Sequence, residues 1–317
     1  MAHEVENLMY VGEKPWHGLG IQLNEPPTIE DAIVQGGLDW DVVRMPLVIE
    51  GTSVKVPAFA NVRSTDNSIL GVVGSTYRPL QNKDAFSWFQ PYLESGEITL
   101  ETAGSLKNGR HVWILARIKQ DPIEIVKNDP VLSYVLLSNS HDGTRTVRAG
   151  MTAIRTVCAN TLAAAHSDKA SKLLKVRHTD NTVLALDKVR EALDLINREF
   201  RATTDGMKQM ARRGVTIDTL KKYIQLVFEP KETVEDEEEI NLKMERQAAR
   251  IIPLFERGRG NDMPGVKGTM WAAYNSVTEY LTWERGRNAD NRLENLWLGN
   301  AAHVAQKAYD VALKMAA

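Results

Sequence analysis

The sequence predicts an α+β protein with an N-terminal antiparallel β-sheet, a hairpin followed by a long helix, and a helical C-terminal half. Three observations predict this class. Short apolar or alternating runs in the first third of the chain are broken by Gly, Pro, Asn and Asp, as strands and turns are. A clear hairpin pattern follows, and beyond it apolar residues recur at helical spacing. Strands first and helices second is the order of an α+β fold.

The region before residue 120 carries strand patterns around one helix pattern. Strands are expected over residues 38–49, 52–64, 68–80 and 109–119. Residues 82–96 are expected to form a short helix, because Phe86, Phe89 and Leu93 recur at helical spacing. Asn82 is of a residue type that caps helix N-termini, so we expect it to begin this helix.

The hairpin joins residues 130–140 to residues 145–153. Both runs have apolar centres, and Asp142-Gly143 lies between them. Glycine supplies the positive φ that a tight hairpin turn requires. We therefore expect two strands that flank this turn on both sides.

The chain beyond the hairpin is expected to be helical. Residues 158–174 are rich in Ala and Leu, and residues 181–203 carry an apolar stripe that fits an amphipathic helix of about six turns. The stripe consists of Val183, Leu186, Val189, Leu193, Ile196 and Phe200. Further helices are expected over residues 216–228, 269–284 and 291–315.

These patterns divide the chain into two regions. Residues 1–205 are expected to form a β-rich core with the hairpin and the long helix, and residues 206–317 a helical C-terminal region. The acidic run at 231–240 is expected to be a solvated helix or linker in the second region. Residues 256–268 form a glycine-rich basic loop between two predicted helices.

Composition excludes several classes of protein. Hydrophobic residues at 43% and charged residues at 25% are ordinary for a globular protein. The N-terminus lacks the pattern of a signal peptide, and no run of about 18 apolar residues occurs. The single cysteine, Cys158, excludes an internal disulfide and fits a reducing compartment. We expect a cytoplasmic protein of a bacterial cell, without membrane contact.

The net charge of −2 is unevenly distributed along the chain. Residues 1–143 hold 11 Lys and Arg against 18 Asp and Glu, whereas residues 144–222 hold 16 against 8. A basic middle between acidic flanks is what a polyanion-binding surface requires. The alternative is a set of solvated helix faces, which charge bias alone does not exclude.

No arrangement of catalytic or metal-ligating residues is visible in the sequence. The seven histidines include no HxxH or HExxH pair, so no metal site is expected. Cys158 and His166 would lie about 12 Å apart along a helix, too far for direct activation of the thiol. The glycines and lysine at 257–269 do not follow the GxxxxGK[ST] order of a phosphate-binding loop. We therefore expect a protein that is not an enzyme and needs no cofactor.

The strongest cluster of cations lies around the hairpin and the segment after it. Arg145 and Arg148 lie on the second hairpin strand, and Arg155 lies where strand is expected to give way to helix. The N-terminus of that helix, near residues 159–160, would add backbone donors for phosphates. The expected nucleic-acid contacts are Arg145, Arg148, Arg155, Lys169, Lys172, Lys175, Arg177, Arg257, Arg259 and Lys267. The alternative is that some of the arginines cap helices or pair with Asp142, Asp168 or Asp187.

Three segments together resemble one protein family. They are EKPWHGLG at 13–20, SHDGTRTVRAGMTAIRTVCANTL at 140–162 and GTMWAAYNSVTEYLTWERGRNADNRLENLWLG at 268–299. In this order they resemble the phage/plasmid-related family of unknown function, from which ENLWLG departs conservatively. The resemblance implies a protein of a phage, prophage or conjugative element. A more distant similarity to the RecT/Redβ-like single-strand annealing proteins implies a hairpin sheet packed on a long helix, rings or filaments, and DNA in a basic groove.

The resulting hypothesis is an ATP-independent protein that binds single-stranded DNA and anneals complementary strands in recombination or replication. It would act as a homo-oligomer, a ring or a filament. The alternative is a non-catalytic protein-interaction factor of a mobile element, with an anti-defence or regulatory role. A nuclease or nucleotide hydrolase is disfavoured, because no acidic cluster with metal-ligand spacing is visible.

Overall fold

The computed structural model describes residues 5–12, 20–157, 160–163, 174–176, 178, 190–229, 237–285, 295–296 and 299–317. It is an α+β fold with β-sheets in the N-terminal half and helices in most of the C-terminal half, as the sequence predicts. The chain divides into two compact units. Unit 1 comprises residues 1–120, 134–150 and 168–196, and unit 2 comprises residues 121–133, 151–167 and 197–317. The boundary expected after residue 205 falls inside a helix of unit 2.

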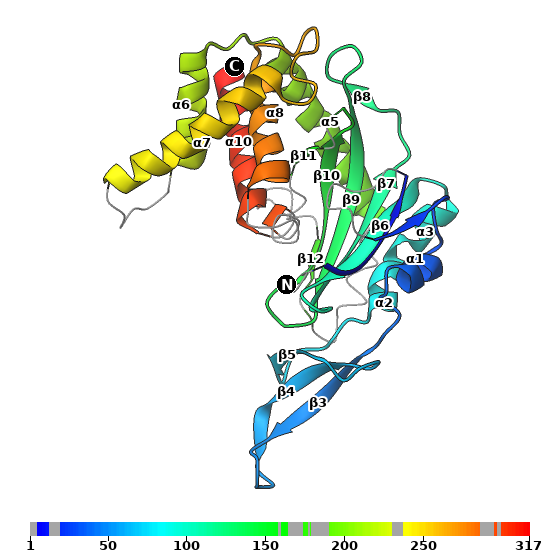
Figure 1. Cartoon of the computed structure of the whole chain (residues 1–317). Helices are drawn as coiled ribbons and strands as arrows, with labels where there is room; N and C mark the ends of the chain where they lie inside the picture. Colours follow the sequence, from blue (N-terminus) through cyan, green and yellow to red (C-terminus); the bar gives the residue numbers. More distant parts are fainter. Residues whose placement is uncertain are drawn as a thin grey trace. The chain divides into compact units, whose positions relative to one another are not determined.

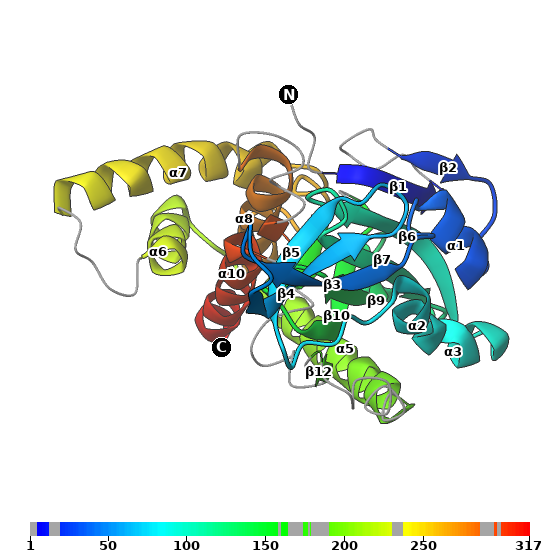
Figure 2. The same cartoon turned by 90° about the horizontal axis from the view of Figure 1, so that it is seen from below.

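The main sheet, most of which belongs to unit 1, is built from neighbouring antiparallel strands, with one parallel pair at its edge. Its strands follow the order β2-β1-β6-β7-β9-β10, and β12 also pairs with β10 (Figure 1 and Figure 2). The bounds are β1 Val5–Val11, β2 Ile21–Leu23, β6 Ile98–Leu106, β7 His111–Ile118, β9 Pro130–Ser140, β10 Val147–Arg155 and β12 Leu174–Val176. The hairpin of β9 and β10 and its turn are confirmed, with Gly143 at a φ of 77°.

Three short helices of unit 1 accompany the main sheet. They are α1 Ile29–Gln35, α2 Asn82–Phe86 and α3 Gln90–Glu94, with a 3-10 turn, η1 Ser87–Phe89, between the last two. Helices α1 and α3 contact β6 (Figure 2). Asn82 is not the N-cap that the sequence predicts: Gln81 holds that place, and Asn82 is buried. The Asn82 amide is used inside the core instead, where it donates to the Leu38 carbonyl at 3.0 Å.

A second, smaller sheet in unit 1 confirms the three strands expected between residues 38 and 80. Its order is β3-β4-β5, and the strands are β3 Val42–Val48, β4 Lys55–Arg63 and β5 Ile69–Gly74 (Figure 1). Asn61 on β4 is buried and donates to the His141 carbonyl at 2.7 Å. One face of the small sheet is therefore anchored within unit 1.

Unit 2 is mainly helical. Its helices are α5 Arg190–Ala211, which begins in unit 1, α6 Ile217–Phe228, α7 Glu237–Arg257, α8 Met270–Glu279, the π-helix η4 Tyr280–Glu284 and α10 Asn300–Ala316. Helices α6, α7, α8 and α10 contact one another around α8, on which every residue is buried (Figure 1). Residues 237–240 of the acidic run belong to α7, and residues 231–236 lie outside the described part.

The segment after the hairpin differs from the expected helix. Asn160–Ala163 forms strand β11, which pairs antiparallel with the end of β10, and Leu174–Val176 forms β12. The open edge of β10 offers backbone partners to the chain that follows it, and this pairing overrides the helix propensity of an Ala-rich segment. The helix N-terminus predicted near residues 159–160 is therefore wrong. Strand β8 Ile123–Glu124 pairs with the start of β9 in the same unit.

None of the helices in the described ranges is both long and apolar enough to cross a membrane.

Candidate nucleic-acid interface

Three of the cations predicted from the sequence lie together on one segment of unit 2. Arg257 ends α7, and Arg259 and Lys267 lie on the loop that connects α7 to α8. All three side chains are exposed. This loop segment, residues 257–267, is the part of the predicted contact set that presents several exposed cations from a described backbone.

The other predicted contacts are placed in part. Arg145 and Arg148 are half-buried in unit 1, in the turn and on β10. The backbone of Lys175 on β12 pairs with Arg148. Lys169, Lys172 and Arg177 lie outside the described residues.

Arg155 requires a correction. It is 0% exposed, and its Nε and Nη2 atoms donate to the two carboxylate oxygens of Asp129 at 2.6 and 2.9 Å. A guanidinium buried in this way is not available to a phosphate group. The sequence places Arg155 at a strand-to-helix junction, whereas it ends strand β10 inside unit 2.

The guanidinium of Arg155 also holds the loop segment 257–267 in place through two backbone carbonyls. Its Nη1 donates to the carbonyl of Arg259 at 3.2 Å, and its Nη2 donates to the carbonyl of Gly260 at 2.9 Å. Arginine carries five N–H donors in a rigid fork, so one side chain can hold a carboxylate and two carbonyls at once. The indole of Trp271 completes the centre by donating to Asp129 at 2.8 Å. Arg155 thus acts as a buried support for the loop that carries Arg259.

The buried carboxylate of Glu279 and the side-chain amide of Asn261 also hold the loop segment in place. The backbone N–H of Arg259 donates to the carboxylate of Glu279 on α8, at 3.1 Å for the nearer oxygen. Burial raises the pKa of Glu279, and the Arg259 N–H opposes this effect. The side chain of Asn261 donates to the carbonyls of Leu254 and Ala272, at 2.9 and 3.2 Å. Residues 259–261 are therefore held by hydrogen bonds to Arg155, to α7 and to α8.

Gly260 is required by this arrangement. Its φ is 71°, a region that L-residues rarely adopt, and a Cβ at this position would lie 2.6 Å from Cγ1 of Val157 and 3.1 Å from Nη2 of Arg155. The loop can approach the buried arginine this closely because the residue has no side chain.

The side chain of Arg259 lies on an aromatic ring. Its guanidinium carbon is 3.7 Å from the ring centroid of Trp283, which is half-buried on η4. A cation over the face of a tryptophan ring is attracted by the ring quadrupole. Backbone anchoring and ring contact together fix the direction in which this exposed cation points.

Unit 1 contains a second buried polar cluster, formed by three histidines and Asp142. Asp142 accepts hydrogen bonds from Ser140, Thr144 and, at 3.1 Å, from Nε2 of His111. Burial by itself would raise the pKa of Asp142, but these hydrogen bonds together hold it well below its usual range. The carboxylate thus fixes the turn from which β10 begins.

Two histidines of this cluster, His141 and His178, are kept neutral. Burial, and to a lesser degree the nearby His178, lowers the pKa of His141 to about 3, and its Nε2 lies 2.9 Å from Oδ1 of Asn82. Burial also lowers the pKa of His178 to about 4, and its ring stacks on Tyr77 with centroids 4.6 Å apart. Among the residues that the structure describes, no group of three or more His, Cys, Asp or Glu is arranged to hold a metal ion.

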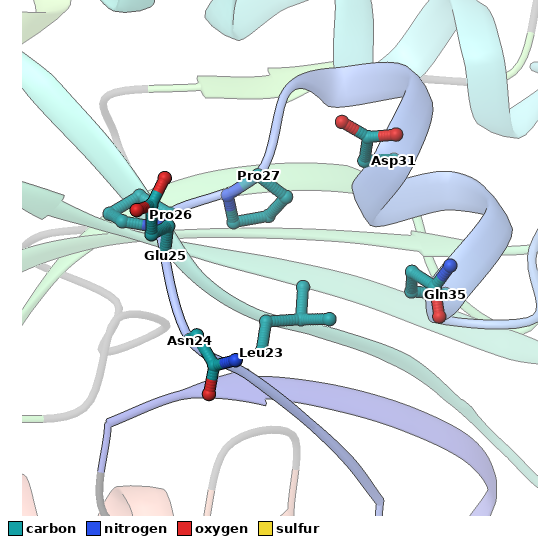
Figure 3. A pocket seen from close by; sticks show the side chains of 7 residues that line it. All are labelled: Leu23, Asn24, Glu25, Pro26, Pro27, Asp31 and Gln35. Carbon is teal, nitrogen blue, oxygen red and sulfur yellow. The ribbon is translucent and has the colours of Figure 1, made fainter.

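An open depression beside α1 does not suit nucleic acid. Figure 3 shows its lining, in which Glu25 and Asp31 are the charged side chains and Pro26 and Pro27 form one wall. The Asp31 carboxylate accepts from the hydroxyl of Thr28, the N-cap of α1, at 2.8 Å. An acidic lining repels phosphates, so this depression is not part of the interface.

The sequence patterns pointed to the exposed cations but missed the residues that support them. Asp129, Asn261, Trp271 and Glu279 were not singled out as site residues. Trp271 and Glu279 do fall in the family-like block at 268–299, and Asp129 directly precedes the first hairpin strand. A buried arginine requires an opposite charge, but no spacing rule connects residue 155 to residue 129.

Comparison with known proteins gives one finding. The family model for a domain of unknown function, DUF932, matches residues 69–297, a range that includes the hairpin, Arg155, the cationic loop and Glu279. No curated protein and no solved structure matches the chain. The match supports the expected family of unknown function and carries no information on a phage origin or on RecT/Redβ-like proteins. Because the matched residues make up most of the sequence, the chain belongs to the DUF932 family.

Proposed function

We propose that this protein binds single-stranded DNA and anneals complementary strands without nucleotide hydrolysis, in the recombination or replication of a phage or other mobile element in a bacterial cytoplasm. The observation that carries the proposal is the segment 257–267, where three exposed cations lie on a loop held by the buried Arg155–Asp129 pair. Arg145 and Arg148, together with the basic stretch 169–177, extend the proposed contact set.

Rigid cations favour binding to phosphates. Ordering a flexible loop on a ligand costs free energy that a loop already ordered does not lose. Arginine adds a planar fork that matches two phosphate oxygens. Annealing then needs no covalent step, since base pairing supplies the free energy once the strands are held close together.

Filter binding to a single-stranded oligonucleotide across a salt series tests the proposal. The logarithm of the binding constant should fall linearly with the logarithm of the salt concentration, with a slope of about −0.7 for each phosphate contact. Changing Arg257→Gln and Lys267→Gln together should make this slope shallower by about 1.4 and weaken binding at every sequence.

The matched control changes two exposed lysines of α6, Lys221→Gln and Lys222→Gln. This variant should bind as the unchanged protein does. Binding that is absent at low salt, or that does not change with salt, would overturn the proposal, and so would an equal loss in the control. Mixing complementary strands without ATP then measures annealing directly.

A second observation favours the expected self-association, or the alternative role as a protein-interaction factor. The pairing register of β3, β4 and β5 places Val43, Met45, Ile69 and Val72 on one face of the small sheet, and each is more than 40% exposed. Ala60 and Val62 lie between them on β4, and the face carries no charged residue. Exposed apolar faces of this kind mark interaction sites.

We propose that a second copy of the chain covers this face. A twofold contact places like against like, which an uncharged apolar face tolerates without electrostatic repulsion. Sedimentation should show an oligomer that dissociates in the variant Val43→Lys and Val72→Lys, with an unchanged circular dichroism spectrum. A monomer at about 10 µM would overturn this proposal, and oligomers without DNA binding would favour the protein-interaction factor. Electron microscopy with DNA would show whether the oligomers are rings or filaments.

A further inference from the structure

Arg259 differs from Arg257 and Lys267, the other two cations of the segment 257–267, because its guanidinium contacts the ring of Trp283. Arg257 and Lys267 are exposed charges, whereas the guanidinium carbon of Arg259 lies 3.7 Å from the ring centroid of Trp283. One side of the guanidinium is therefore covered by the indole. Because Arg259 is still exposed, a second planar group can approach it from solvent.

Both Arg259 and Trp283 are held in place by contacts within unit 2. The backbone of Arg259 donates to Glu279 and accepts from Arg155. Trp283 lies on the π-helix η4, whose residues Leu281 and Thr282 are buried and whose first residue, Tyr280, packs edge-on against Phe228 with centroids 6.2 Å apart. Single π-turns are rare and often lie at functional sites. The stack is therefore part of a fixed surface.

The local charge favours a base over a phosphate as the partner of Arg259. Residues 256–268 carry three cations, but the carboxylates of Glu256 and Asp262 are also exposed on this segment, which leaves a formal charge of +1. The two carboxylates offset part of the attraction of this segment for phosphates. A planar, weakly hydrated guanidinium is well suited to stacking on a nucleobase.

We propose that Arg259, supported by Trp283, stacks on an unpaired base of the bound strand, while Arg257 and Lys267 contact the adjacent backbone. This proposal rests on the single-stranded DNA binding proposed above and specifies its recognition element. Every base has a π-face, so the contact tolerates any sequence but requires that the base be unpaired. The protein would then prefer single strands to duplexes, as an annealing protein must before pairing.

The experiment compares two oligonucleotides of equal length and charge by fluorescence anisotropy with the full-length protein. One carries normal bases, and the other carries abasic sugars at every position. The unchanged protein should bind the normal strand more tightly. The variant Arg259→Lys keeps the charge and the backbone contacts but loses the planar stack. We expect it to bind the normal strand about 5- to 30-fold more weakly and the abasic strand within twofold of the unchanged protein.

Trp283→Leu should give the same selective loss, and Arg246→Lys is the matched control on the exposed surface of α7. Circular dichroism checks each variant, and Arg259→Lys alone decides the result if Trp283→Leu does not fold. An equal loss on both strands would overturn the proposal, because Arg259 would then contact phosphate, and so would no loss on either strand. If the unchanged protein binds neither strand, the proposed function fails and this inference fails with it.

Discussion

The two units bury polar centres of opposite kinds. In unit 2 the Arg155 guanidinium is fully buried as a charge, opposite the carboxylate of Asp129. In unit 1 the imidazole of His141 is equally buried, but burial lowers its pKa to about 3 and leaves the ring neutral. One centre keeps its charge because an equal and opposite charge lies beside it. The other centre is neutral because burial disfavours the charged form of the imidazole, and its hydrogen-bond partner is the neutral Asn82.

This difference determines which change destabilises each centre: the loss of a partner or a change of protonation. The buried ion pair depends on both partners being present. The neutral His141 and His178, in contrast, oppose protonation.

The largest effect is expected when the ion pair is broken. The variant Arg155→Met leaves the carboxylate of Asp129 buried, with the Trp271 indole as its remaining donor among the residues that the structure describes. Removing one partner of a buried pair costs about 3–5 kcal/mol of unfolding free energy. Urea denaturation measures it, and the same change at the exposed Arg246 should cost no more than about 0.5 kcal/mol.

The double variant Arg155→Met with Asp129→Leu sharpens the test. Replacing both members of a buried pair with apolar residues is often nearly neutral. It should therefore be more stable than Arg155→Met alone. A double variant less stable than the single one would show that the bond from the Trp271 indole to Asp129 contributes more than the unpaired carboxylate costs.

A smaller effect is expected from lowering the pH. Since the pKa of His141 is about 3 when folded and 6.5 in the reference state, the unfolded chain binds the proton more tightly. Stability is then fully present above pH 6.5 and falls by about 1.4 kcal/mol for each pH unit below it, so about 2 kcal/mol is lost by pH 5 through this one residue. His178, with a pKa of about 4, acts in the same direction.

Urea denaturation at pH 7.5 and 5.0 measures this loss. In His141→Gln the dependence on pH should become shallower by the contribution of one histidine, whatever the absolute stability of the variant. His303→Gln, at an exposed position of α10, should leave the dependence unchanged. An identical pH dependence in His141→Gln and the unchanged protein would contradict the assignment of a buried neutral imidazole.

The smallest effect concerns how closely the loop approaches Arg155. Gly260 and Gly268 both have positive φ, but a Cβ on Gly268 would have no atom within 4 Å. Gly268→Ala should therefore cost about 1 kcal/mol for the backbone conformation alone. Gly260→Ala should cost about 1 kcal/mol more, because Val157 and Arg155 must shift. Thermal unfolding of the two variants gives the difference, and equal costs would mean that the contact at Gly260 is loose.

The parts of the fold that the sequence predicted are those set by local pattern. The hairpin turn at Gly143, the strands β3 to β5 and the helix α6 all follow from periodicity and turn chemistry. The predictions that were wrong concern contacts with other segments of the chain. Asn160–Ala163 pairs with the edge of β10 instead of forming a helix. The side chain of Asn82 forms a hydrogen bond with His141 instead of capping a helix.

The candidate site was predictable to the same extent. The exposed Arg257, Arg259 and Lys267 could be selected from a glycine-rich basic loop. The role of Arg155 could not, because the same arginine in the same strand pattern is a surface contact or a core ion pair depending on a carboxylate 26 residues away. Burial depends on how the whole unit packs, and the spacing of residues in the local sequence does not predict it.

The path of the chain between the two units limits how the protein can be divided. Strands β9 and β10 each begin in one unit and end in the other, at Tyr134 and Met151. A fragment that stops at residue 205 would hold Arg155 and Asp129 but lack Gly260, which is 105 residues from Arg155 in the sequence. Such a fragment would carry a buried cation without its carbonyl acceptors. A truncation series therefore removes fold and function together, and point substitutions are the way to separate them.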